Sequence, residues 1–433
     1  MKKVLRITAL VLAVLIALSA VWFLIIRPII GKTATVISSE NYKINGGMMS
    51  YLVMMQMEEY IETHTTLYGK DYIENLGINQ EKSLKKQNSP YGESWFSYFY
   101  DKAAEAMNHT LLLCETANDA GVTLTEKEIK ALTKAAEEHK KYGTENVLYV
   151  MKAKALADKY EDNFYTSLSY DAEDYQKYYE ENKQEFDVVD YKYMVVAAVQ
   201  DETFDKDMAQ TTAKSAANNL VRKIKKQGFD KAAEEYLASI ESDKKLDEFI
   251  VTEYAYEKRT QFGVWAFSDE RKQGDVKIFE GSGQFAVYYI EKPAYKLDYP
   301  TRQLQMITMS YGKDPYAALR KMRETYNKWE DMENTEENFK TLSDNVELEN
   351  IYKENTSEKL LNWVYSDVRK VGDYELIQDA ASLYLVRFVG ESGSSFTQRA
   401  NESLGKSNFN KILDDAKEKY PVKVKTGIKR FVK

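Results

Sequence analysis

Few residues of this chain have the types and spacing that catalysis or metal binding requires. The histidines are His64, His109 and His139, and the one cysteine is Cys114. No pair among them has the close spacing of a zinc site, and one cysteine can form neither a thiolate cluster nor an intrachain disulfide. Cys114 ends an apolar run at 111–114, so we expect it to be a small buried residue. The sequence therefore predicts no metal and no cofactor.

Motifs of other chemistries are not supported either. Gly405-Lys406-Ser407 lacks the upstream glycine of a phosphate loop, because Ala400 stands at that position, and no Gly-x-Ser-x-Gly elbow occurs. The 68 Asp and Glu residues are so numerous that spacing alone leaves an Asp/Glu pair for glycoside hydrolysis as an open alternative. A net charge of −8 argues against nucleic acid, which is bound by clustered cations.

The composition indicates a folded, multidomain protein that favours helices. The 433 residues exceed what one hydrophobic core usually organises, and there are only 6 Pro and 19 Gly. The 33 tyrosines suit a peptide-binding surface, because the ring gives contact area while the hydroxyl tolerates water. The alternative is that they occupy ordinary half-buried positions.

The N-terminal segment predicts a membrane anchor. Lys2, Lys3 and Arg6 precede an apolar stretch at 7–26, whose twenty residues span about 30 Å as a helix, the thickness of a bilayer core. The basic residues hold that end in the cytoplasm, so the rest of the chain is expected outside. Ala17-Leu18-Ser19 offers a signal-peptide cleavage site as the alternative, but the apolar run continues past it. An exported protein without disulfides fits a Gram-positive envelope.

The next part of the chain has a helical pattern. Thr125 to Glu128 form a capping box, and Gly121 suits the end of the preceding helix. We expect helices at 93–120, 126–141, 144–162 and 171–184.

At Phe186 the pattern changes to that of an α/β domain. Strands are expected at 188–196, 276–279 and 284–291, with helices at 205–226 and 229–239 between them. We expect Lys292-Pro293 to end the last strand and Tyr299-Pro300 to form a linker.

An internal repeat indicates a second copy of this domain. The segment Trp-Ala-Phe-Ser-Asp-Glu-Arg-Lys-Gln-Gly-Asp at 265–275 recurs as Trp-Val-Tyr-Ser-Asp-Val-Arg-Lys-Val-Gly-Asp at 363–373, an offset of 98 residues. The second copy opens with a strand at 303–309 and has a shorter helical middle. A Gly/Ser loop after Gly390 is expected to lead to a last helix at 397–420 and a basic tail.

Each repeat has a structural explanation that needs no ligand. The glycine is expected to end the helix that carries the tryptophan, and Arg271-Lys272 and Arg369-Lys370 to lie in its last turn against the helix dipole. Trp265 and Trp363 are then core residues, with a peptide cradle as the alternative.

Three short motifs resemble the SurA- and PrsA-type foldases. They are Tyr-Tyr-Glu-Glu-Asn-Lys-Gln-Glu-Phe at 178–186 before a strand, Gly-Val-x-Leu-Thr-x-x-Glu-Ile at 121–129, and the Lys/Arg-x-Gly-Asp turn before a Tyr-rich strand. The resemblance covers about 36–418. It implies an α+β protein with a transmembrane helix, an all-α chaperone region, two tandem degenerate parvulin-like α/β domains and a C-terminal helix. The expected boundaries are 1–31, 32–185, 186–297, 298–392 and 393–433.

The resemblance also implies where catalysis would occur. Parvulin isomerases carry a histidine in the first and in the last strand, and the matching positions here are Tyr193 and Ala286 in the first copy and Met306 and Tyr384 in the second. Rotation about an X-Pro amide has a barrier of roughly 20 kcal/mol, and the imidazoles that help lower it are missing. We therefore expect little or no isomerase activity.

A chaperone that only holds unfolded secreted polypeptides needs apolar, adaptable surface instead of catalytic groups. An active isomerase and a structural adaptor of an envelope or secretion complex are the alternatives. For the methionines, a packed core is the alternative to a flexible binding surface. The peptide-binding candidates are Met48, Tyr51, Met54, Met55, Tyr193, Trp265, Tyr288, Trp363 and Tyr384.

Overall fold

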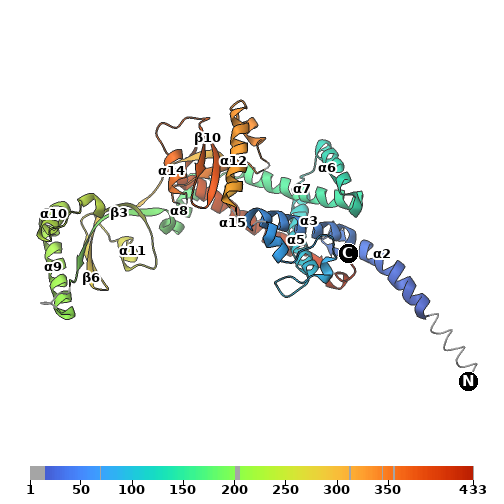
Figure 1. Ribbon diagram of the computed structural model, residues 1–433, viewed down its shortest axis with the longest axis horizontal. Coiled ribbons are helices and arrows are strands. Elements are labelled where there is room, and N and C mark those ends of the chain that lie inside the picture. The colour runs from blue at the N-terminus through green and yellow to red at the C-terminus, as the bar shows by residue number, and fades with distance from the viewer. Residues whose placement is uncertain are drawn as a thin grey trace, which may run out of the picture. The chain divides into compact units, whose positions relative to one another are not determined.

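The computed structural model describes residues 15–68, 70–199, 205–311, 314–343, 345–354 and 356–432. The protein has the mixed α+β structure that was expected, and it contains three small antiparallel sheets (Figure 1). Two compact units can be separated. The first comprises Met1–Ser169, Arg302–Gly390 and Ser403–Lys433, and the second comprises Tyr170–Thr301 and Glu391–Glu402.

One N-terminal helix, Leu15–Thr33, is long and apolar enough to cross a membrane, a test that a signal sequence also passes. It contains a π-helical turn, η1 (Trp22–Ile26), and continues as α2 (Arg27–Thr33). Leu24 is 77% exposed, and exposure of a leucine side chain is unfavourable in water but not in lipid. Lys2, Lys3, Arg6 and the start of the expected anchor lie outside the described residues.

The helical part of the first unit packs around α5, which contacts both α3 and α7. The Ser94 side chain caps α5 by accepting a hydrogen bond from the Ser97 amide, and the capping box of Thr125 and Glu128 starts α6 as expected. Gly121 has φ +67°, which confirms its place after α5. The elements are α3 (Gly46–Tyr68), α4 (Lys70–Asn75), η2 (Leu84–Lys86), α5 (Trp95–Asp119), α6 (Glu126–Glu138), η3 (Lys140–Tyr142), α7 (Thr144–Ser167) and α15 (Ser395–Lys419), which belongs to this unit from Ser403 onward.

The expectation of an all-α region is wrong at its edge. Three short strands form an antiparallel sheet in the order β11-β1-β2: β1 (Thr35–Ser38), β2 (Lys43–Asn45) and β11 (Lys423–Val424). Strands this short carry too few alternating residues for a period of two to be recognised. β11 and η5 (Thr426–Ile428) bring the C-terminal tail beside α2 (Figure 1).

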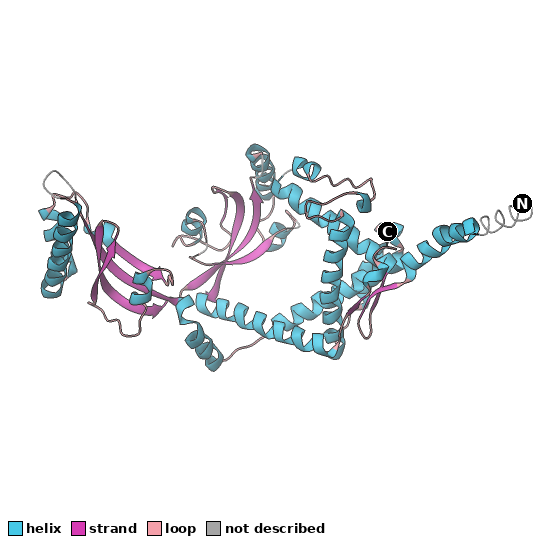
Figure 2. Ribbon diagram, turned by 90° about the horizontal axis from the view of Figure 1, so that it is seen from below, coloured by secondary structure: helices cyan, strands magenta, loops and turns pink. Residues whose placement is uncertain are grey.

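The first four-stranded sheet lies in the second unit and has the order β4-β3-β6-β5. Helix α9 packs against one face of it, and the short helix α11 covers part of the other (Figure 2). Helix α8 leads directly into β3. The elements are α8 (Ala172–Phe186), β3 (Asp187–Ala197), α9 (Lys206–Gln227), α10 (Phe229–Ser239), η4 (Leu246–Phe249), β4 (Ile250–Ala255), α11 (Gln261–Ala266), β5 (Val276–Gly281) and β6 (Gln284–Lys296).

The second four-stranded sheet has the order β8-β7-β10-β9. When the strands of each sheet are numbered along the chain, both sheets have the same order, 2-1-4-3. Strands β6 and β10 also begin and end at the 98-residue offset of the sequence repeat. The repeat therefore corresponds to one strand order used twice. The elements are β7 (Pro300–Ser310), α12 (Pro315–Glu330), α13 (Glu336–Lys340), β8 (Glu347–Ile351), α14 (Glu358–Val364), β9 (Tyr374–Gln378) and β10 (Ser382–Ser394).

Several strands continue through positions where the sequence predicted a strand end or a linker. Strand β6 runs through Lys292-Pro293, which lie where the register with β3 shifts, and a proline is tolerated at such a bulge. Strand β7 begins at Pro300, so no linker follows Tyr299, and β10 continues through Gly390.

The helices of the repeat end earlier than expected. Helix α11 ends at Ala266 and α14 at Val364, so the Arg-Lys pairs lie in turns beyond them and meet no helix dipole. Gly274 and Gly372, with φ +92° and +91°, form those turns instead of ending the helices.

Candidate peptide-binding face

One side of the first sheet gathers aromatic rings into a continuous cluster. We call it the aromatic face, and it comprises Tyr191, Tyr193, Tyr254, Phe262, Trp265, Phe279 and Tyr288.

The alternation of side chains along β3 and β6 explains this cluster. Tyr191 and Tyr193 are two residues apart and share one side, whereas Met194 and Val287 point to the core under α9. The register places Tyr193 opposite Tyr288, with ring centroids 6.0 Å apart and planes 24° apart. Ala286, expected at the second dyad position, lies opposite Val195.

Phe262, in α11, is the centre of the cluster. Its ring stacks on Tyr288 at 4.1 Å and meets the edge of Tyr191 at 4.5 Å. The Thr260 side chain caps α11 by accepting a hydrogen bond of 2.9 Å from the Gly263 amide. A Cβ at Gly263 would lie 2.4 Å from the Glu257 carbonyl oxygen, so only glycine allows this close turn.

The aromatic face is partly open to solvent. Tyr191 and Phe262 are buried, while Tyr193, Trp265, Phe279 and Tyr288 are half-buried. Beside Phe279, a groove of about 720 Å³ lies between α11 and β5, which is an edge strand. Val264, 55% exposed, lines this groove together with cationic side chains of Lys258, Arg259 and Lys277.

Two tyrosine hydroxyls of this face, those of Tyr191 and Tyr288, are held in the neutral form. Burial raises the pKa of both Tyr191 and Tyr288, and the neighbouring tyrosines raise it further. A neutral phenol can donate or accept a hydrogen bond but is no general base near pH 7. The chemistry available here is contact and hydrogen bonding.

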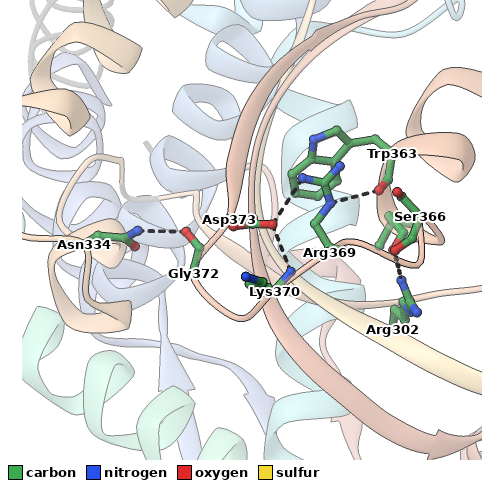
Figure 3. A network of polar contacts seen from close by, with 9 residues as sticks. Arg302, Asn334, Trp363, Ser366, Arg369, Lys370, Gly372 and Asp373 are labelled. Atoms are coloured by element: carbon green, nitrogen blue, oxygen red, sulfur yellow. Dashed lines mark hydrogen bonds and ion pairs between the residues drawn. The ribbon is translucent and has the colours of Figure 1, made fainter.

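A turn that recurs in both sheets fixes each tryptophan. In the second copy the Arg369 guanidinium lies 3.9 Å from the Trp363 ring centroid, its Nε donates to the Trp363 carbonyl, and its Nη1 lies 3.4 Å from Asp373 (Figure 3). In the first copy Arg271 lies 5.2 Å from the Trp265 ring and 3.1 Å from Asp275.

The backbone of this turn is tied to the last strand in the same way in both copies. The Gly372 amide donates to Phe388 and the Phe388 amide to Asp373, and the same bonds join Gly274, Ile290 and Asp275. Asn334 and Arg302 add bonds to the second turn (Figure 3). These contacts support the structural explanation of the repeat.

The second sheet brings its predicted residues together on an aliphatic surface. Met306 is buried, and Trp363 and Tyr384 are half-buried beside it, packed on Leu304 and Val386. The described residues show no ring cluster there comparable to the aromatic face.

The methionine-rich helix α3 is mainly core. Met48 and Tyr51 are buried in the helical region, and Met54 and Met55 are half-buried against it. This packing supports the core alternative for the buried pair.

Sequence reasoning found Tyr193, Trp265 and Tyr288 but missed Tyr254, Phe262 and Phe279. Tyr191 could have been found, because it shares the strand face of Tyr193. Phe262 and Phe279 come from separate elements that only the fold brings together.

A scan of protein-family models found none that matches this chain, and a search of curated proteins found no match either.

Proposed function

We propose that this protein is a membrane-anchored extracytoplasmic chaperone that binds unfolded secreted polypeptides, with the aromatic face as its principal binding surface. In this proposal the two four-stranded sheets are degenerate parvulin-like domains and the helical region is of the SurA/PrsA kind. The observation that carries it is the half-open aromatic face beside a groove and an edge strand.

The contacts favour unfolded chains over one specific ligand. Aromatic side chains bury 150–250 Å² each, and apolar burial contributes roughly 25 cal/mol/Å² before ordering costs. Such contacts depend little on client sequence. The β5 edge adds backbone groups that an extended segment could pair with. Lys258, Arg259 and Lys277 keep the rim of the groove charged.

The shared strand order of the two sheets supports a duplicated domain, and the sequence has no histidine beyond His139. A binding function needs no imidazole. Because the histidines of the parvulin isomerases are missing, little or no isomerase activity is expected.

Binding of an unfolded client and protection of a client from aggregation test the proposal. The full chain, reconstituted in nanodiscs, is mixed with permanently unfolded carboxymethylated α-lactalbumin, and binding is measured by fluorescence anisotropy. We expect Trp265→Ala combined with Phe279→Ala to weaken binding at least tenfold. Tyr316→Ala, which removes a 75% exposed ring on α12, is the matched control and should leave binding unchanged. No binding and no protection by the unmodified chain at stoichiometric amounts would refute the function.

An active isomerase is the second candidate, because Tyr193 and Tyr288 face each other across β3 and β6. A proline-limited refolding assay separates the two functions. Accelerated refolding that is lost on Tyr193→Phe or Tyr288→Phe would establish the enzyme, whereas a chaperone alone leaves the slow phase unchanged.

A further inference from the structure

The groove between α11 and β5 is bordered by three cations. Lys258 and Arg259 lie in the turn before α11 and Lys277 lies on β5, and all three are exposed and line the groove of about 720 Å³. The ion pairs nearby use other cations, so among the described residues none neutralises these three. Glu257, next to Lys258 in the sequence, does not line the groove, and its carboxylate is hydrogen-bonded to the Tyr254 hydroxyl.

Glu280 is the one carboxylate among the described lining residues, and it faces the opposite side of the sheet. Side chains alternate along β5, so Lys277 shares the aromatic side with Phe279, and its ammonium lies 5.1 Å from that ring centroid. Glu280 lies on the α9 side, where its carboxylate is 3.7 Å from the Lys214 ammonium. The three cations therefore border the groove without a carboxylate on their own side of the strand.

The position of the groove suits an extended chain. Strand β5 is at the edge of its sheet, so its outer backbone groups can pair with a further strand. In such a strand alternate side chains lie on one side, about 7 Å apart. One of them can lie among the cations while the next covers Phe279 and Val264, which is 55% exposed.

Granting the client binding proposed above, we propose that this groove selects extended client segments in which an acidic residue lies two positions from an aromatic or large aliphatic one. The carboxylate would lie against Lys258, Arg259 and Lys277, and the apolar side chain against Phe279 and Val264. A second copy of β5 is disfavoured, because pairing two such edges brings like charges together. A free anion would leave the apolar wall uncovered.

Peptide binding to the full chain in phosphatidylcholine nanodiscs tests this selectivity. Three labelled peptides carry phenylalanine alternating, at every second position, with glutamate, glutamine or lysine, and binding is measured by fluorescence anisotropy. We expect the glutamate peptide to bind about tenfold more tightly than the lysine peptide, with the glutamine peptide between them. The difference should shrink as added salt screens the charges.

Charge reversal locates the preference. Lys258→Glu with Arg259→Glu should abolish or invert the order of the two charged peptides, while the glutamine peptide binds about as before. Lys231→Glu with Lys272→Glu is the matched control, because these exposed lysines of the same unit do not line the groove, and it should keep the order. Circular dichroism checks that both pairs fold.

Each contrary result has its own meaning. Equal binding of the three peptides, or binding of carboxymethylated α-lactalbumin but of none of them, would overturn the selectivity and leave client binding intact. Failure of the peptides and of lactalbumin alike would refute both. A preference that the reversed pair leaves unchanged, or that the control pair alters equally, would place it outside the groove. Dimerisation of the unmodified chain that the reversed pair abolishes, measured by mass photometry, would assign the groove to a second copy instead.

Discussion

The rings of Phe262 and Tyr288 lie stacked, with centroids 4.1 Å apart and planes 24° apart, and this contact joins α11 to the central strand β6. Phe262 is buried, whereas Tyr288 is half-buried at the open side. The buried ring thus supports the half-buried one, and packing within the protein sets the shape of the aromatic face.

Replacing the central ring should destabilise the second unit. Phe262→Ala removes a buried side chain that contacts several other rings, and such truncations lower the free energy of unfolding by about 3–5 kcal/mol. Urea denaturation followed by circular dichroism measures the change. Tyr316→Ala should stay within about 0.5 kcal/mol, since its ring is exposed. Equal effects of the two substitutions would show that Phe262 is not central to the packing.

The two turn glycines should respond alike. Gly274 and Gly372 have φ near +90°, and an added Cβ would meet no atom closer than 3.5 Å at either place. Backbone strain alone should therefore reduce the free energy of unfolding, by about 1–3 kcal/mol for each change to alanine. Gly427→Ala, at a glycine without positive φ, should have little effect. Thermal denaturation compares the variants, and an unchanged midpoint for both turns would contradict the argument.

The free energy of unfolding should fall as the pH rises from about 4.5 to about 7, because of the carboxyl group of Glu349. Burial, aided by neighbouring Glu347, raises the pKa of Glu349 to about 7 from 4.5, so the folded state keeps a proton that the unfolded chain has lost. Above pH 7 the ionised group opposes folding. Glu349→Gln should raise the free energy of unfolding by about 1 kcal/mol at pH 8 and leave it unchanged at pH 4. This value allows for solvent screening of a half-exposed group.

Glu375→Gln on β9, the other edge strand of the same sheet, is its control. Urea midpoints measured from pH 4 to pH 8 should be parallel for this control and the unmodified chain. A Glu349→Gln curve parallel to both would show that Glu349 ionises normally.

The C-terminal tail should be essential to the helical region. Val432 is fully buried in the core of the helical region, so Val432→Asp would bury an unpaired charge and lower the free energy of unfolding by more than about 2 kcal/mol. Lys425→Asp, at an exposed site of the same tail, should change it little. Denaturant titration monitored by the buried Trp95 is the measurement, and a normal midpoint for Val432→Asp would separate the tail from this core.

The sequence predicted the elements whose signals are local. The capping box at Thr125, the strand change at Phe186 and the 98-residue repeat all depend on neighbouring residues or on self-similarity, and each corresponds to a feature of the fold. Strand β11 could not be predicted, because its two residues become a strand only by pairing with the distant β1, and β1 itself is only four residues long. The strand end expected at Pro293 is absent for a related reason, because a bulge in the register with β3 accommodates the proline.

The candidate site was predictable only in part. The period of two along β3 and β6 indicates that Tyr193 and Tyr288 lie on strands, and the repeat singles out Trp265. Phe262 joins them through tertiary packing of a six-residue helix, which no local pattern specifies. The methionines of α3 have the composition of an adaptable surface, but burial decides their role.

The pairing of Ile37 with Val424 has a consequence for biogenesis. Because most of the chain lies between these two residues, β1 is synthesised long before its partner β11. Until then β1 keeps an unpaired edge and the core around it stays unsealed. A chain that is cut short before β11 would keep this edge open, and an open strand edge is a place where another chain can add a strand.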